Sequence, residues 1–164
     1  MMISRDLANA INQQIANEFG ASMQYLSIAA HFQQRHLTLL SKLFFDQAEE
    51  ERQHAMKLVK YLIDAKGALA VPAIPAAKQT FASAEEAAQA AYDWEVEVTR
   101  QINGLMEIAQ RENDYLAQGF LQWFVDEQLE EVNKMERIVA AIRQSGERNL
   151  LMVEAYLVHI EKAG

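Results

Sequence analysis

Four apolar stripes with helical spacing run through this sequence, and a glutamate interrupts each stripe near its middle. Apolar residues that recur every three or four positions lie on one face of an α-helix and are buried there. The four interrupting residues are Glu18, Glu51, Glu95 and Glu131. A helix that buries its stripe also buries the glutamate, so the chain requires a fold whose core tolerates four carboxylates.

Signals for helix ends separate the stripes and predict an all-α fold. Ser4 and Ser83 are suitable N-caps, Asn113 or Asp114 can cap a later helix, and Gly67 is suited to end one. The low content of proline and glycine, two and six residues in 164, also favours helices. We expect one domain, residues 1–164, with helices at about residues 5–35, 39–66, 84–111, 114–145 and 148–162.

Loop lengths predict how these helices are connected. Short turns join the first helix to the second and the third to the fourth, so each pair should form an antiparallel hairpin. A long irregular stretch, residues 67–82, contains Pro72 and Pro75. A connection of this length can run along a bundle. The expected architecture is a four-helix bundle with one long crossover connection and a short C-terminal fifth helix.

The four glutamates should meet at one level of such a bundle. Each glutamate lies about 12 to 16 residues from the turn that joins the two helices of its hairpin. At ~1.5 Å per residue, the two glutamates of a hairpin therefore lie at the same depth to within about one helical turn. Carboxylates that are removed from water and packed together are unstable as charged groups unless cations neutralise them. Two divalent ions would balance four carboxylates, and this charge balance predicts a two-metal site.

His54 adds a nitrogen ligand to the predicted site. Glu51 and His54 are three residues apart, so their side chains share one helix face and can bind one ion. That spacing is common by itself, but three further glutamates at matched depth make chance a poor explanation. Oxygen ligands with one imidazole suit iron or manganese better than a metal that prefers thiolates.

Composition disfavours several functions. The net charge of −8 disfavours binding to nucleic acid, because that affinity depends on lysine and arginine. The absence of cysteine rules out disulfides and fits a reducing compartment. No stretch is apolar and long enough to span a bilayer, and the N-terminus has no signal-peptide core. We therefore expect no membrane association and a cytoplasmic location.

Four segments carry a resemblance to a known family. They are residues 17–25, 48–55, 92–95 and 121–131. Through them the chain resembles the bacterial non-haem ferritins over essentially its whole length. The resemblance implies an iron-storage protein that oxidises Fe(II) with O₂ or H₂O₂ and deposits Fe(III) mineral in a hollow shell.

The same resemblance implies roles for individual residues. Two iron ions would bind at a ferroxidase centre, the first held by Glu18, Glu51 and His54. The second would be held by Glu51, Glu95 and Glu131, with Glu51 bridging the two ions. Gln128 resembles a glutamine that forms a hydrogen bond near the oxygen-binding position. Tyr25 resembles a tyrosine that can donate an electron during oxygen reduction.

A third iron site and the absence of haem are further implications of the resemblance. Glu50, Glu127 and Glu130 resemble the ligands of a third ion, with Glu131 shared. Glu130 stands where several related di-iron proteins have a histidine. Arg52 stands where haem-binding members have a methionine, so no haem is expected by that route.

The fifth helix bears on assembly. Its apolar face is too short to be stable alone and must be buried. By resemblance it would pack around a fourfold axis in a 24-subunit homo-oligomer; otherwise it would dock on its own bundle. The face consists of Leu150, Val153, Leu157 and Ile160.

Two alternative functions are open at this point. One is a soluble di-iron peroxidase or oxygenase that acts on another substrate and forms no shell. The other is a metal-free structural bundle.

Overall fold

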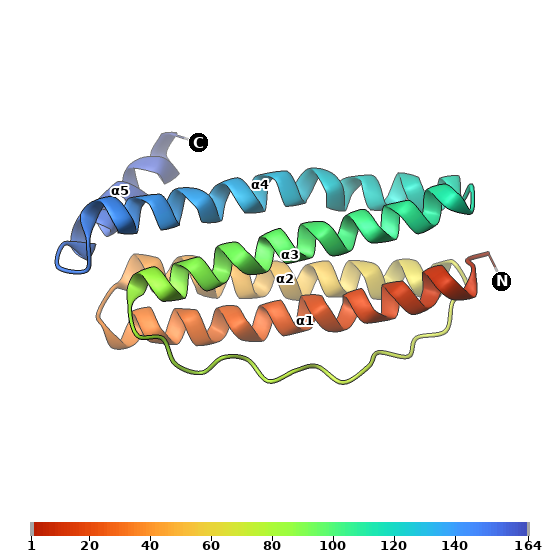
Figure 1. Cartoon of the computed structure of the whole chain (residues 1–164), viewed down its shortest axis with the longest axis horizontal. Coiled ribbons are helices and arrows are strands. Elements are labelled where there is room, and N and C mark those ends of the chain that lie inside the picture. Colours follow the sequence, from red (N-terminus) through yellow and green to blue (C-terminus); the bar gives the residue numbers. More distant parts are fainter. Residues whose placement is uncertain (1, 164) are drawn as a thin grey trace.

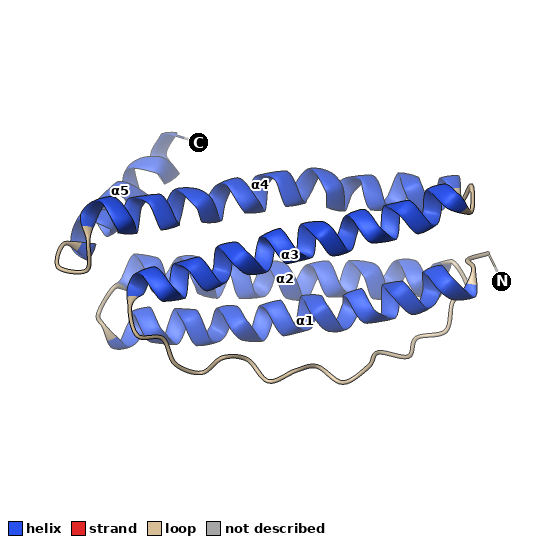
Figure 2. Ribbon diagram, in the orientation of Figure 1, coloured by secondary structure: helices blue, strands red, loops and turns tan. Residues whose placement is uncertain are grey.

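Five helices make up the fold, as the sequence predicts. A computed structural model describes residues 2–163 of the chain, with side chains described through residue 159. The helices are α1 (Arg5–Gln34), α2 (Thr38–Asp64), α3 (Ala84–Arg111), α4 (Tyr115–Ser145) and α5 (Leu150–Ala163). Helices and loops account for all the described residues (Figure 2), and the expected all-α class is confirmed.

The first four helices lie side by side along the long axis of the molecule (Figure 1). α1 packs against α2 and α3 against α4, each pair joined by a tight turn, and α1 also contacts α3. The loop between α2 and α3 runs the length of the bundle beside α1, which makes α3 parallel to α2 and antiparallel to α1 (Figure 1). The bundle therefore has the expected single crossover connection.

Two buried amides of α1 hold the crossover in place. Asn12 donates to the carbonyl oxygen of Ala68 at 2.9 Å and accepts from the amide of Ala70 at 2.7 Å. Farther along α1, Gln24 donates to the carbonyl oxygen of Lys78 at 3.2 Å and accepts from its amide at 2.9 Å. Each side-chain amide pairs with one backbone N–H and one backbone carbonyl of the crossover, which is neither helix nor strand and so lacks regular backbone hydrogen bonds.

Side-chain caps begin three helices at the predicted residues. The oxygens of Ser4, Ser83 and Asp114 accept hydrogen bonds from backbone amides three residues later, at 3.0, 3.0 and 2.9 Å. These caps satisfy amides that have no partner within the helix. The reciprocal contact at Ser83 differs from the standard capping box, because Glu86 accepts from the amide of Ala82 instead.

The end of α2 differs from the expectation. The sequence predicts a helix that runs to about residue 66 and is ended by Gly67, but α2 ends at Asp64, and the residue with positive φ after it is Lys66, at 62°. Gly67 is required for a different reason: a Cβ there would lie 2.4 Å from Cδ1 of the buried Leu62. The amide of Gly67 also donates to the carbonyl oxygen of Leu62 at 2.8 Å.

The hydrophobic core is divided into two clusters, one toward each end of the bundle. Along α1 one cluster ends at Ile15 and the other begins at Ala21. Along α4 the corresponding boundary falls between Phe124 and Met135. The residues that separate the clusters are buried and polar, and they include all four predicted core glutamates.

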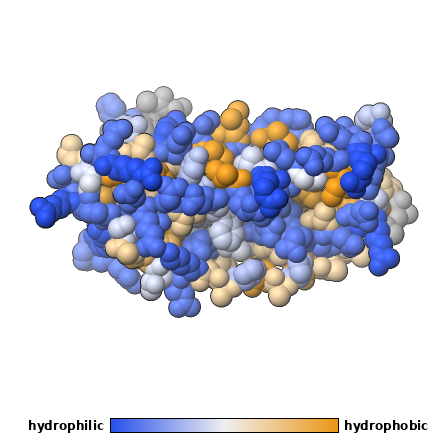
Figure 3. Space-filling model, viewed as in Figure 1, coloured by the Kyte–Doolittle hydropathy of each residue, from blue (hydrophilic) through white to orange (hydrophobic). Residues whose placement is uncertain are grey.

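α5 leaves the bundle at one end and docks on it with one face (Figure 1). Leu150, Val153 and Leu157 are buried against the bundle, as expected, whereas the side chain of Ile160 lies outside the described residues. Leu151 and Met152, on the other side of α5, are exposed by 73% and 65%. The face of the molecule in Figure 3 is mainly hydrophilic, with separate apolar areas between charged side chains. None of the described helices combines the length and hydropathy needed to span a membrane.

The packing at Gly67 gives a matched pair of predictions. Gly67→Ala should lower stability by about 1 kcal/mol, because the new methyl group must displace Leu62. Gly104→Ala should raise stability by about 0.5–1 kcal/mol, because Gly104 is helical and nothing lies within 4 Å of the position that a Cβ would take. Thermal unfolding of both variants at one protein concentration tests this, and equal midpoints would contradict it.

Candidate metal centre

Five buried side chains from four helices meet at the boundary between the two hydrophobic clusters. We call them the metal centre: Glu18, Glu51, His54, Glu95 and Glu131. Ligand atoms of Glu18, Glu51 and His54 lie within 4.8 Å of one another, and so do carboxylate oxygens of Glu51, Glu95 and Glu131. None of the five side chains belongs to a residue more than 5% exposed. The matched depths inferred from the sequence therefore correspond to one layer in the structure.

Glu51 belongs to both ligand groups, so it lies between two potential cation positions. His54 is on the same face of α2, with Nδ1 3.1 Å from a carboxylate oxygen of Glu51. The rings of Trp123 and Phe124 pack edge-on against the imidazole of His54, with ring centroids 5.4 and 6.0 Å away. These contacts fix the orientation of the ring before any cation binds.

Side-chain amides also hold the carboxylates. Gln14 donates to Glu18 at 2.8 Å, and Gln47 donates to Glu51 at 2.9 Å and to Glu131 at 2.7 Å. These two glutamines were not predicted from the sequence, although each lies four residues before a core glutamate, a spacing that brings side chains together on a helix. The second carboxylate oxygen of Glu18 is buried and has no hydrogen-bond partner among the described residues.

Two other expected residues contact Glu95. The hydroxyl of Tyr25, which is fully buried, donates to one carboxylate oxygen of Glu95. The amide of Gln128 donates to the other oxygen at 3.1 Å and lies 3.2 Å from the hydroxyl of Thr99. Tyr25 and Gln128 are thus in the layer where the sequence places them, and their roles there stay predictions.

The electrostatics of the layer reflect its crowding. Burial, followed by the charge of Glu51, raises the pKa of Glu95 to about 8. Burial also raises the pKa of Glu131 to about 7, although the charge of Lys134 opposes the rise. Burial and the proximity of Glu51 raise the pKa of Glu18 well above its usual range. Without cations, Glu95 and Glu131 therefore retain protons near neutral pH.

Glu51 and His54 behave as an ion pair within this layer. Burial disfavours the charge on Glu51, but the hydrogen bond and charge of His54 outweigh it and lower the pKa of Glu51. Burial likewise disfavours the charged imidazole, but Glu51 outweighs it and raises the pKa of His54. A cation that binds His54 needs one ring nitrogen without a proton, so cation and proton compete for this residue.

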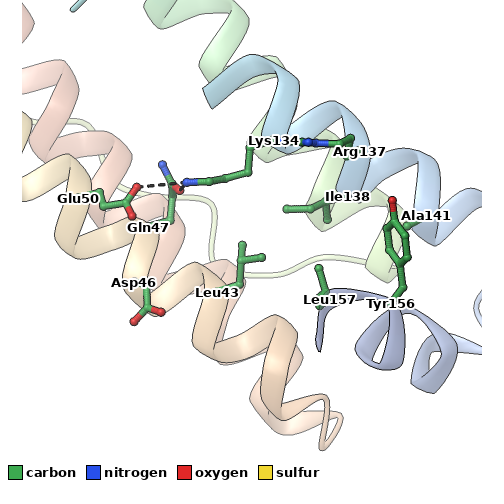
Figure 4. Close-up of a pocket in the computed structure, with 10 residues that line it drawn as sticks. All are labelled: Leu43, Asp46, Gln47, Glu50, Lys134, Arg137, Ile138, Ala141, Tyr156 and Leu157. Carbon is green, nitrogen blue, oxygen red and sulfur yellow. Dashed lines mark hydrogen bonds and ion pairs between the residues drawn. The ribbon is translucent and has the colours of Figure 1, made fainter. Parts of the chain in front are cut away.

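The three glutamates expected at a third site are not gathered in the same way. Glu127 is 3.9 Å from His54 through its carboxylate, Glu130 is exposed, and Glu50 contacts the ammonium of Lys134 at 3.2 Å. Lys134 also donates to Gln47 at 2.7 Å (Figure 4). This lysine was not predicted from the sequence, although it lies three residues after Glu131.

The donor set is suited to hard or borderline divalent cations. Carboxylate oxygens and one imidazole favour iron or manganese over metals that prefer sulfur. The shared Glu51 and the two overlapping ligand groups provide room for two adjacent ions. The buried, unpartnered oxygen of Glu18 is the position in the layer that most clearly lacks a positive partner.

Comparisons with known proteins agree with this geometry. A ferritin-like domain matches residues 8–145. Ferritin BfrB of Mycolicibacterium smegmatis is 41% identical over 147 residues, which cover 90% of this chain and 81% of that protein. The bacterial non-heme ferritin of Staphylococcus haemolyticus is 34% identical over 146 residues, covering 89% and 88%. An open pore ferritin from the hyperthermophilic archaeon Archaeoglobus fulgidus superposes with a TM-score of 0.91 at 34% identity, covering 95% of this chain and 96% of that one.

The raised pKa values predict how stability depends on pH when metal is removed. Glu95 and Glu131 hold protons in the folded state up to about pH 8 and 7, whereas in the unfolded chain they lose them near 4.5. The folded state therefore binds more protons between pH 5 and 8, and stability must fall as pH rises through this window. The expected loss is on the order of 2 kcal/mol per subunit or more.

Thermal unfolding in chelator, measured from pH 5 to 8, tests this dependence. Glu95→Gln should flatten the curve and raise the midpoint at pH 8, because it removes one buried carboxylate. Glu97→Gln is the matched control, since Glu97 is exposed on the same helix and its hydrogen bonds from Arg100 and Gln101 lower its pKa below this window. The same slope in wild type and Glu95→Gln would contradict this expectation.

Proposed function

This chain belongs to the ferritin family of iron-storage proteins, and we propose that it acts as a ferroxidase, oxidising Fe(II) at its metal centre. The resemblance inferred from the sequence motifs is confirmed by the domain match and by the curated relatives. The observation that carries the proposal is the pair of buried ligand groups that share Glu51. Two Fe(II) ions held on either side of one carboxylate can deliver two electrons to a single oxidant.

The proposed reaction balances with either oxidant. Each Fe(II) gives up one electron, and O₂ takes two electrons and two protons to form hydrogen peroxide. Hydrogen peroxide in turn can take two electrons and two protons to form two water molecules. Iron is the substrate and the cargo, and the protein supplies ligands, orientation and charge balance. The Fe(III) product then leaves the metal centre and is deposited as mineral.

We assign first-ion ligation to Glu18, Glu51 and His54 and second-ion ligation to Glu51, Glu95 and Glu131. Their burial and the absence of a partner for one Glu18 oxygen among the described residues support this assignment. Metal ions would replace the protons that the layer otherwise retains, so binding removes the cost of packing these carboxylates together.

Gln128 and Tyr25 have proposed roles beside the ligands. Gln128 holds one oxygen of Glu95 and offers an amide close to the position of the second ion. Tyr25 donates to the other oxygen of Glu95, so an electron lost from its ring could be accompanied by transfer of the hydroxyl proton to that carboxylate. Glu50, Glu127 and Glu130 remain a predicted ligand set for a third ion, which would have to compete with the ammonium of Lys134 at Glu50.

We also propose self-association into a 24-subunit shell. The exposed Leu151 and Met152 of α5 support it, because an apolar face on a terminal helix is normally covered by a partner. The structural neighbour from Archaeoglobus fulgidus is an open pore ferritin, and a pore implies an enclosed assembly. A peroxidase or oxygenase without a shell is not favoured, because the relatives are ferritins.

Loss of a ligand should abolish rapid iron oxidation. Anaerobic loading with two Fe(II) per subunit followed by O₂ should give fast oxidation in the wild type. Glu51→Ala and His54→Ala should slow it at least about tenfold, since either change breaks the shared ligand set. Stopped-flow absorbance of Fe(III) measures the rate.

Glu49→Ala is the control for this experiment. Glu49 lies on the same helix, but it is exposed and bound to Arg52 and Gln53. It should oxidise iron at the wild-type rate. Wild-type rates in Glu51→Ala and His54→Ala would show that the assignment of the centre is wrong.

Assembly size is a separate prediction. A shell of 24 chains of 18.6 kDa should have a mass of about 450 kDa in size-exclusion chromatography coupled to light scattering. Introducing charge by Leu151→Glu and Met152→Glu should reduce this mass if α5 is an interface. A monomer or dimer in the wild type would overturn the storage-shell proposal.

A further inference from the structure

Lys134 places a positive charge against the metal centre from the side of α4. Its ammonium lies 3.2 Å from Glu50 and 3.3 Å from both oxygens of Glu131, and it donates to Gln47 at 2.7 Å. Lys134 therefore bridges α4 to α2, where Gln47 and Glu50 are one turn apart (Figure 4). Two of the residues it contacts, Glu50 and Glu131, belong to the ligand set expected for a third ion.

Lys134 completes the charge balance of Glu50 and the four glutamates of the metal centre when two ions are bound. The four glutamates of the metal centre and Glu50 carry five negative charges when ionised. Two divalent ions and one ammonium carry five positive charges. A third divalent ion on Glu50 and Glu131 would lie within a few ångströms of an ammonium that already contacts both carboxylates and repels the ion.

The cavity next to Lys134 adds a second obstacle to a third cation. It has a volume of about 280 Å³ and lies between α2, α4 and α5. Lys134 and Arg137 stand together on the α4 side of this cavity, and Ile138 and Leu157 contribute apolar wall (Figure 4). A cation bound to Glu50 in this cavity would share it with two positive side chains, Lys134 and Arg137, as well as with the carboxylate of Asp46.

We propose that Lys134 is a built-in cation that takes the place of a third metal ion and limits each subunit to two. This inference rests on the proposed two-metal function, and it means that Lys134 determines how many metal ions each subunit binds. The ammonium neutralises Glu50 and contacts both oxygens of Glu131, so it shares that carboxylate with the second metal. Glu50, Glu127 and Glu130 then form a third site only when the lysine is removed.

Zn(II) binding tests the proposal without any redox chemistry. The intact assembly is freed of metal with chelator and titrated with Zn(II) by isothermal calorimetry. The wild type should bind two ions tightly per subunit, and Lys134→Leu should bind three. Lys134→Gln is a second variant with the same expectation if the leucine variant fails to assemble.

Three control variants separate the effect of the lysine from a general effect on packing. Lys134→Arg keeps the positive charge and should bind two ions. Arg137→Leu removes the other cation that lines the cavity, for which Figure 4 marks no ion pair with Glu50, and this variant should also bind two. Glu50→Gln in the Lys134→Leu background should remove the additional ion.

The outcomes distinguish this inference from the proposed function. Two ions in wild type, Lys134→Leu and Lys134→Gln would overturn the role of Lys134 and leave the metal centre intact. Three ions in the wild type would also overturn it, because the lysine would not exclude the third. If the wild type binds no Zn(II) at either ligand group, the assignment of the metal centre itself is wrong.

Discussion

The burial of four carboxylates in one layer is the constraint on which the rest of this structure depends. A helix bundle normally fills its core with apolar side chains, and each buried charge without a partner costs several kcal/mol. Here the layer is supported from several directions, by the amides of Gln14, Gln47 and Gln128 and by the hydroxyl of Tyr25. These groups orient the carboxylates but supply too little positive charge to balance them, and that deficit favours the binding of cations in the layer.

Much of this arrangement could be predicted from the sequence because it depends on helical periodicity. Spacing along each helix gives the buried face, and loop lengths give the direction of each helix, so the depth of Glu18 relative to Glu95 follows from arithmetic. The caps at Ser4 and Ser83 are equally local, since each involves only residues within one turn. Predictions of this kind need no knowledge of side-chain conformation.

The features that were missed depend on side-chain conformation or on contacts between helices. In the sequence, Lys134 resembles any polar residue of a helix, and only the conformation of its side chain brings the ammonium to Glu50 on α2. Lys66, and not Gly67, has the positive φ after α2. Gly67 is instead constrained by the position of the Leu62 side chain, which the sequence does not reveal. The contact between Tyr25 and Glu95 joins residues on two helices, and periodicity alone does not decide which oxygen faces which hydroxyl.

The division of the core into two clusters has a consequence for how the subunit responds to iron supply. Each cluster is a contiguous apolar unit, so the two ends of the bundle can open separately if the layer between them is weak. Bound cations would join the four helices at this seam and couple the two ends into one cooperative unit. A subunit deprived of iron is then expected to exchange its backbone amides faster, and to be cleaved by proteases sooner, than a subunit that holds metal.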